Sequence, residues 1–126
     1  MERDFEHWCS NRGVLLMVRR AHGAARLRGL IGMPPLGPAC ALLLPGCRSV
    51  HGLAMRYAID VIFLDARLCV LRVQTLNPAR LLVCRAATHT AELRAGECER
   101  LGIALGDCFE SQQVCDKAVN SAVPAA

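Results

Sequence analysis

With 126 residues, of which 53% are hydrophobic, the chain is long enough for one compact domain and too apolar to be disordered. Its formal net charge is +4, and its basic half, positions 11–59, carries seven arginines and no acidic residue. Such a half can attract nucleic acid, anionic lipid or an acidic protein surface, but we interpret it as a solvated basic face. Nucleic acid is not an expected partner, because stacking aromatics and helix-turn-helix or finger patterns are absent from it.

The chain begins with a segment, residues 1–12, that we expect to be a loose leader. Its start, MERDFEHW, is acidic and contains no apolar stretch, so it is not a secretory signal. The longest apolar runs, at 41–44 and 61–64, are far shorter than the ~20 residues of a membrane-spanning helix. These features predict a cytoplasmic protein with no membrane span.

The first half of the chain predicts short elements separated by breaks. The apolar run Val14–Val18 predicts a buried strand, and residues 23–30 predict about two turns of helix. Glycine and proline then interrupt regular structure at 32–38. The run ALLL at 41–44 predicts another strand, which a Pro-Gly pair ends.

The longest extended segment is predicted over Ser49–Asp65. From Tyr57 its side chains alternate between two faces, because successive residues of a strand point in opposite directions. Both faces are largely apolar, which is typical of a central strand covered on both sides. Asp60 is the exception, since a carboxylate inside a core needs a partner.

Shorter elements follow in the second half. We expect an antiparallel partner strand, two short strands, one helix and a last strand, at 68–76, 81–85, 88–93, 97–101 and 108–110. The whole pattern predicts a mainly β fold, a small single-domain β-sandwich or barrel with one or two short helices. The domain is expected to span residues 13–110, and residues 111–126 are expected to form a mobile tail.

Eight cysteines raise the question of a metal site or of disulfides. No C-x-x-C pair occurs, and the nearest combinations, Cys47 with His51 and Cys84 with His89, are each at most half of a zinc site. We therefore predict no metal and no other cofactor. In a reducing compartment stable disulfides are not expected, so the cysteines are interpreted as small packing residues.

Three separate segments carry a family signature: GLIGMPPLGP (29–38, the first family segment), VHGLAMRYAIDVIFLD (50–65, the second) and AGECERLGIALGD (95–107, the third). In this order and spacing they resemble the bacterial family called domain of unknown function 192 (DUF192). The resemblance implies a compact, mainly β domain of sandwich type. It implies no reaction, because no enzymatic activity is established for the family as a whole. Some relatives are exported or encoded near secretion or pilus-assembly genes, which points to a link with the cell envelope.

The chain departs from the family pattern in or beside these segments. Ala54 stands where glycine is usual, Ala58 where proline is usual, and Arg94 where proline is common. If the backbone at position 54 has a positive φ, alanine there costs on the order of 1 kcal/mol relative to glycine. We expect such departures to preserve the fold and to weaken any ligand site that the family shares.

The second family segment carries the candidate site residues. His51, Arg56 and Asp60 are the residues we expect to bind a small anionic ligand, since arginine recognises carboxylate and phosphate groups. For Asp60 we favour a structural role, in which it accepts hydrogen bonds from backbone N–H groups of a neighbouring loop, or from Arg26 or Arg28. A direct bond from Arg56 is marginal, because the two Cα atoms would lie ~13 Å apart along a strand.

Ser49, His51 and Asp60 also supply the residue types of a hydrolase triad. A triad needs hydrogen bonds from hydroxyl to imidazole to carboxylate, and no nucleophile-elbow pattern surrounds Ser49. The interpretation we favour is a non-catalytic β domain that binds another protein or a small anionic ligand. The alternative is a small hydrolase or ligand-processing enzyme, which requires His51 and Asp60 to converge in one pocket.

Overall fold

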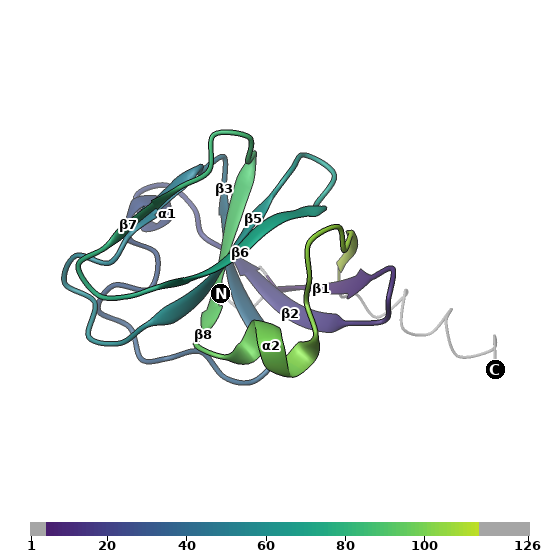
Figure 1. Cartoon of the computed structure of the whole chain (residues 1–126), viewed down its shortest axis with the longest axis horizontal. Coiled ribbons are helices and arrows are strands. Elements are labelled where there is room, and N and C mark those ends of the chain that lie inside the picture. Colours follow the sequence, from purple (N-terminus) through teal and green to yellow (C-terminus); the bar gives the residue numbers. More distant parts are fainter. Residues whose placement is uncertain (1–4, 114–126) are drawn as a thin grey trace.

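The computed structural model describes residues 5–113 and is mainly β (Figure 1). A seven-stranded main sheet is accompanied by a small two-stranded sheet. The strands are β1 (Phe5–Ser10), β2 (Leu15–Arg20), β3 (Cys40–Pro45), β4 (Ser49–His51), β5 (Ile59–Leu64), β6 (Val70–Leu76), β7 (Leu81–Val83), β8 (His89–Arg94) and β9 (Phe109–Gln113). The helices are α1 (Ala25–Arg28) and α2 (Glu97–Leu101). Within the described residues, neither helix is long and apolar enough to cross a membrane. The predicted mainly β, single-domain fold is confirmed.

The main sheet curls until its two outer strands meet. Its strands follow the order β6-β5-β8-β3-β2-β1-β9, and all neighbours are antiparallel except β2 and β3. Cys69, just before β6, forms a β-bridge with Cys108, just before β9. Beside this bridge the amide of Val70 donates to the carbonyl of Asp107 at 2.7 Å. The sheet is therefore a barrel, which leaves less unpaired strand edge exposed.

Strand β5 lies inside the sheet, between β6 and β8, and separates two cores. All of its residues are buried. Ile62 and Leu64 enter the barrel core, whereas Val61 and Phe63 enter the outer core. Other buried members of the barrel core include Trp8, Leu16, Val18, Leu43, Leu93 and Phe109. Other buried members of the outer core include Leu30, Leu42, Leu44, Val50, Met55 and Leu76. The prediction of a central strand covered on both faces is confirmed.

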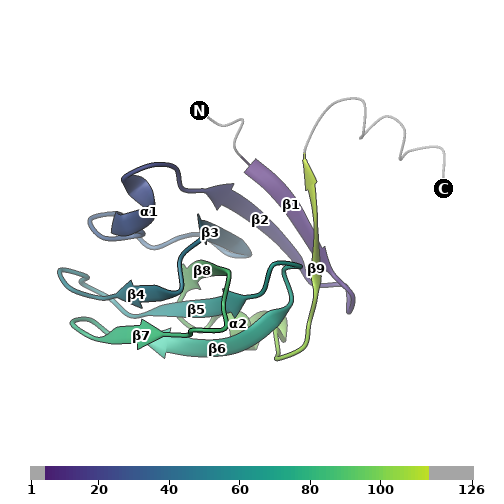
Figure 2. The same cartoon turned by 90° about the horizontal axis from the view of Figure 1, so that it is seen from above.

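The outer core is covered by short elements and connecting chain. Helix α1 is a single turn of four residues, and β4 pairs with β7 in the small sheet. Both lie on the side of the molecule opposite β9 (Figure 2). Leu30 after α1, Val50 on β4 and Met55 after β4 contribute their side chains to this core. Because short elements and loops cover the outer core, pockets form between these segments.

Residues 1–12, predicted to be a loose leader, form a strand in part. β1 pairs with β2 on one side and with β9 on the other, and Trp8 is buried in the barrel core. This strand is hard to recognise in the sequence because two of its buried residues, Glu6 and Ser10, are polar. At the other end, residues 111–113 complete β9, and the remainder of the predicted tail lies outside the described residues.

The single strand predicted over Ser49–Asp65 is wrong, because this segment forms two strands. A turn in which the amide of Met55 donates to the carbonyl of Gly52 at 3.0 Å lies between β4 and β5. β4 pairs with β7, whereas β5 pairs with β6 and β8, so the two strands belong to different sheets. The helix predicted at 97–101 is α2.

A disulfide joins Cys69 and Cys108, so the expectation of unpaired cysteines is wrong for this pair. The two residues are 39 positions apart, and no short spacing in the sequence could indicate their pairing. Closure of the barrel brings them opposite each other, with their Cα atoms 3.9 Å apart. Cys84 and Cys98 are buried in the outer and the barrel core, where they pack as small apolar residues.

Helix α2 is fastened to the barrel by two buried carboxylates. Asp60, on β5, is 5% exposed, and its Oδ2 accepts a hydrogen bond of 2.9 Å from the amide of Cys98. Glu97 is also buried and accepts hydrogen bonds from Arg100 and from the amide of Ala39. The hydrogen bond from Arg100 is the main cause that lowers the pKa of Glu97 to about 2. A backbone N–H group, one of the partners predicted for Asp60, therefore does donate a hydrogen bond to it.

Replacing Asp60 tests this structural role. We expect Asp60→Asn to lower the free energy of unfolding by about 1–3 kcal/mol, because a buried amide loses its charged acceptor. Glu99→Gln is an exposed change on the same helix and is expected to alter stability by less than about 0.5 kcal/mol. Urea unfolding followed by circular dichroism measures both variants. An Asp60→Asn variant as stable as the wild-type chain would show that this carboxylate does not hold α2.

Candidate functional site

A buried glutamate organises the outer core next to α1. Glu92, on β8, is 4% exposed, and its Oε1 accepts a hydrogen bond of 3.1 Å from the amide of Leu30. Gly29 has a φ of 57°, and a Cβ at this position would lie 2.7 Å from the same oxygen. Glycine is therefore required here both by the backbone conformation and by the closeness of the carboxylate. Glu92 thus fixes the position of the first family segment.

The surroundings of Glu92 also change its acidity. Burial raises the pKa of its carboxyl group to about 7, although the hydrogen bond from Leu30 opposes the shift. Among residues 5–113 no arginine forms an ion pair with it. Near neutral pH the group is therefore partly protonated and can either donate or accept a hydrogen bond.

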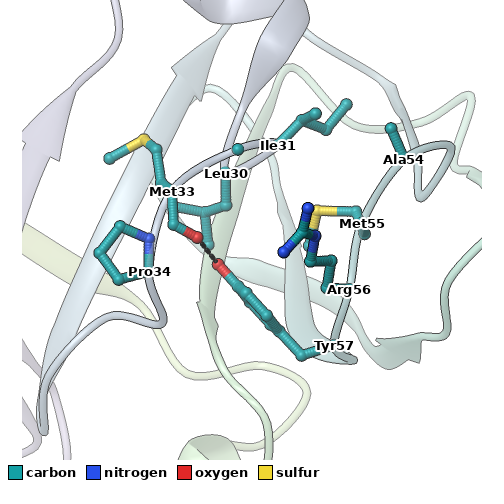
Figure 3. A pocket seen from close by; sticks show the side chains of 9 residues that line it. Leu30, Ile31, Met33, Pro34, Ala54, Met55, Arg56 and Tyr57 are labelled. Atoms are coloured by element: carbon teal, nitrogen blue, oxygen red, sulfur yellow. Dashed lines mark hydrogen bonds between the residues drawn. The ribbon is translucent and has the colours of Figure 1, made fainter.

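One pocket lies between the first and second family segments, and we call it the Arg56 pocket (Figure 3). Its volume is about 560 Å³. Its lining residues are Leu30, Ile31, Gly32, Met33, Pro34, Ala54, Met55, Arg56 and Tyr57. The phenol of Tyr57 donates a hydrogen bond to the carbonyl of Met33 and so joins the two walls. Burial, and then the charge of Glu92, raise the pKa of the Tyr57 phenol.

The Arg56 pocket combines one cation with apolar walls. Arg56 is exposed, and it is the one charged side chain among the described lining residues. Figure 3 shows Arg56 on the same wall as Met55 and Tyr57, and this wall faces Leu30 and Met33. No carboxylate of residues 5–113 forms an ion pair with it. A guanidinium group beside an apolar surface is suited to an anion that has an apolar body.

One wall of this pocket contains a strained residue, Ala54. Its φ is 66°, in the left-handed region, within the turn that the Gly52 carbonyl and the Met55 amide close. Glycine adopts this conformation without the steric cost that a Cβ brings. Position 54 therefore has the positive φ that makes the usual glycine of the family favourable.

Another pocket lies between α1 and β4, and we call it the arginine pocket. Its volume is about 490 Å³. Its lining residues are Arg26, Arg28, Gly29, Leu44, Gly46, Cys47, Arg48, Ser49, Val50, His51 and Glu92. Ser49 and His51 are both exposed and lie on the same face of β4, because they are two residues apart on a strand. The pocket therefore has cationic and polar walls around a buried carboxyl group.

The structure does not bring the predicted ligand residues together. Arg56 lines the Arg56 pocket and His51 lines the arginine pocket, whereas Asp60 lies on the barrel side of β5 and lines neither. Ser49 and His51 do share a pocket, but its carboxyl group belongs to Glu92. The arrangement of Ser49, His51 and Asp60 is therefore not that of a hydrolase triad.

Sequence reasoning missed Glu92 as a site residue. A usable signal existed, since a carboxylate interrupts the apolar residues Ala91 and Leu93 just as Asp60 interrupts its strand. No comparable pattern in the sequence indicates that Arg28 and Arg48 line the same pocket, because this depends on the path of the chain between them. Across residues 5–113, no three His, Cys, Asp or Glu side chains are grouped as they would be around a metal ion.

The strain at Ala54 can be tested directly. Ala54→Gly is expected to raise the free energy of unfolding by about 1 kcal/mol, because it removes the steric cost of a Cβ at positive φ. Ala58→Gly is the control, since Ala58 is in the same loop and does not have a positive φ; it is expected to lower stability by about 0.5–1 kcal/mol. Thermal unfolding measures both variants, and destabilisation by Ala54→Gly would contradict the interpretation.

The pKa of Glu92 predicts a stability that changes with pH. The ordinary pKa of this carboxyl group is 4.5, so between pH 4.5 and 7 the folded chain holds a proton that the unfolded chain has lost. This contribution to stability is fully present below pH 4.5 and is lost as the pH rises through 7. Glu92→Gln resembles the protonated form and does not titrate. Its free energy of unfolding relative to wild type should therefore become more positive, by up to about 3 kcal/mol, from pH ~5 to ~8.

Guanidinium-induced unfolding at these two pH values measures the difference. Glu99→Gln, which removes an exposed carboxyl group, is the control and should show the same difference from wild type at both. A difference between Glu92→Gln and wild type that does not change with pH would show that Glu92 titrates in its ordinary range.

Comparison with known sequences identifies the family. The family model of DUF192, described as Uncharacterized ACR, COG1430, matches residues 11–111. UPF0127 protein PF1050 of Pyrococcus furiosus is 44% identical over 63 residues, which are 49% of this chain and 54% of that protein. The chain thus spans about half the length of the curated relative it matches.

Two solved structures have the same fold. A protein of Sinorhizobium meliloti 1021, proposed to be a transcription regulator, has a TM-score of 0.73 and 20% identity, over 85% of this chain and 92% of that one. A protein of unknown function from Novosphingobium aromaticivorans DSM 12444 has a TM-score of 0.69 and 19% identity, over 84% of this chain and 83% of that one. These low identities bear on the fold alone. The family match over most of the chain shows that this protein belongs to the uncharacterised DUF192 family.

Proposed function

We propose that the protein is a non-catalytic β domain that binds a small carboxylate with an apolar body in the Arg56 pocket. The observation that carries the proposal is the pairing of one guanidinium group with apolar walls, built from two segments that mark the family. The volume of about 560 Å³ is in the range of small-molecule sites. The expected link to export or pilus assembly stays a prediction from the family resemblance.

A carboxylate fits this pocket better than a more highly charged group. A single arginine can form two parallel hydrogen bonds to one carboxylate and neutralise its charge. A phosphate dianion would keep an uncompensated charge beside Leu30, Met33 and Met55, and burying such a charge in apolar surroundings is costly. The apolar side chains are better matched by a short hydrocarbon chain.

The arrangement of polar groups supports binding over catalysis. An enzyme built on His51 and Asp60 needs both groups to reach one substrate, and they lie in different parts of the fold. In the Arg56 pocket, the phenol of Tyr57 already donates to the carbonyl of Met33, and its raised pKa disfavours a role as a base. The pocket therefore offers recognition of an anion and no general base.

Titration with hexanoate tests the proposal. We expect isothermal titration calorimetry to show saturable binding of hexanoate by the wild-type chain and much weaker binding of the neutral hexanamide. Arg56→Ala should raise the dissociation constant of hexanoate by about tenfold or more, because it removes both hydrogen bonds and the charge. Arg56→Lys should recover part of the affinity, since lysine supplies charge without the planar fork.

The matched control is Arg67→Ala, which removes one positive charge from an exposed turn that lines neither pocket. It should bind hexanoate as the wild-type chain does. Equal affinities of Arg56→Ala and wild type, or the same affinity for hexanoate and hexanamide, would contradict the proposal.

A further inference from the structure

We propose that the arginine pocket is a second anion site, which binds the phosphate group of a small phosphate monoester. Its cations come from separate parts of the chain: Arg26 and Arg28 from α1, and Arg48 from the turn before β4. The pocket shares no lining residue with the Arg56 pocket, so the two sites are distinct. This inference stands apart from the proposed carboxylate site and can hold or fail without it.

The arginines of this pocket form no ion pair with an acidic residue within residues 5–113. Arg28 and Arg48 are exposed and form no ion pair with any carboxylate of residues 5–113. By contrast, Arg12 and Arg20, in the same basic half of the sequence, each pair with a buried carboxylate. Positive charges that gather in one pocket and are not held in ion pairs raise its potential and attract an anion. The local charge therefore calls for a ligand with more than one negative charge.

The hydrogen-bond donors of the pocket also suit a phosphate group. The Nη1 atom of Arg26 donates to the carbonyl of Pro45 at 2.9 Å, which holds this guanidinium group in the pocket wall. From β4, the hydroxyl of Ser49 and the imidazole of His51, which lie on one face of this strand, also line the pocket. Donors from two elements can reach different oxygens of one tetrahedral group. Arginine forks together with a hydroxyl group form the usual recognition set of a phosphate.

Glu92 also belongs to the pocket lining. An ionised carboxylate would repel a phosphate, whereas a protonated carboxyl group would donate a hydrogen bond to it. Burial favours the protonated form, in line with the raised pKa of this group. The charged and titratable groups that share the pocket with Glu92 or act on it are Arg26, Arg28, Cys47, Arg48, His51 and Tyr57. Anion binding is therefore coupled to proton uptake and weakens as the pH rises.

Titration of the full chain with glycerol phosphate, inorganic phosphate and sulfate at constant ionic strength tests the site. Arg28→Ala and Arg48→Ala should each raise the dissociation constant of glycerol phosphate by about tenfold or more. Both residues are exposed and make no ion pair within residues 5–113, so these variants are expected to keep the wild-type melting temperature. Arg56→Ala removes the same charge from the other pocket and should leave phosphate binding unchanged. If the alanine variants do not fold, Arg28→Gln and Arg48→Gln are used in their place.

Sulfate separates the titration of the protein from that of the ligand, because it stays doubly charged from pH ~6 to ~8. Its affinity should fall over this range for the wild-type chain, and the part due to Glu92 should disappear in Glu92→Gln. His51→Gln removes the imidazole that lines the same pocket and serves as a second variant for comparison.

Several results would overturn the proposal. One is an affinity for glycerol phosphate that is the same in the wild-type chain, Arg28→Ala and Arg48→Ala. Another is chloride that displaces glycerol phosphate as well as phosphate does at the same ionic strength. A third is binding of glycerol phosphate that does not saturate at millimolar concentration. Binding of duplex DNA with no binding of glycerol phosphate would replace the small-molecule site by a nucleic-acid surface. The affinity for hexanoate distinguishes the two proposals, because it should depend on Arg56 and should not change in Arg28→Ala or Arg48→Ala.

Discussion

The hydrogen bond from the Leu30 amide to the buried carboxyl group of Glu92 is the interaction on which the functional face of the molecule depends. It fixes the chain just after α1 against β8, and it does so at a glycine, because a Cβ at position 29 would lie 2.7 Å from the carboxyl oxygen. The peptide between Gly29 and Leu30 separates the two pockets, since Leu30 lines the Arg56 pocket and Gly29 lines the arginine pocket. A change in Glu92 would therefore alter both pockets.

The three family segments are joined by hydrogen bonds between them and to neighbouring strands. Tyr57 of the second segment donates to the Met33 carbonyl of the first, and Asp60 of the second accepts from the Cys98 amide of the third. Buried carboxylates are costly unless hydrogen-bonded, so each such contact fixes one relative position of two chain segments. The buried polar residues of the family segments thus act first on the architecture of the chain. The Arg56 pocket and the arginine pocket follow from where that architecture places Arg56 and the other arginines.

Much of the fold could be predicted from local pattern, and the remainder depends on contacts between distant residues. The alternation along β5 and the glycine-bounded helix α2 are local, and both are present as predicted. β1 was missed because its buried face contains Glu6, which is polar but bonded to Trp8 and Ser111 inside the fold. The disulfide between Cys69 and Cys108 follows from closure of the barrel, which no spacing in the sequence reveals. In the same way, His51 and Asp60 are close in sequence and separate in space.

The Arg56 pocket and the arginine pocket differ in charge, which predicts a domain that recognises small anions by their chemistry. The Arg56 pocket suits an anion with a single charge and an apolar body, and the arginine pocket suits a phosphate group. The measurement that tests the central claim most directly is the location of bound hexanoate by NMR amide-shift mapping of the full chain. The account predicts shifts concentrated at residues 30–34 and 54–57, the two walls of the Arg56 pocket. Shifts confined to the exposed strands on the opposite side of the barrel, or none at saturating hexanoate, would contradict it.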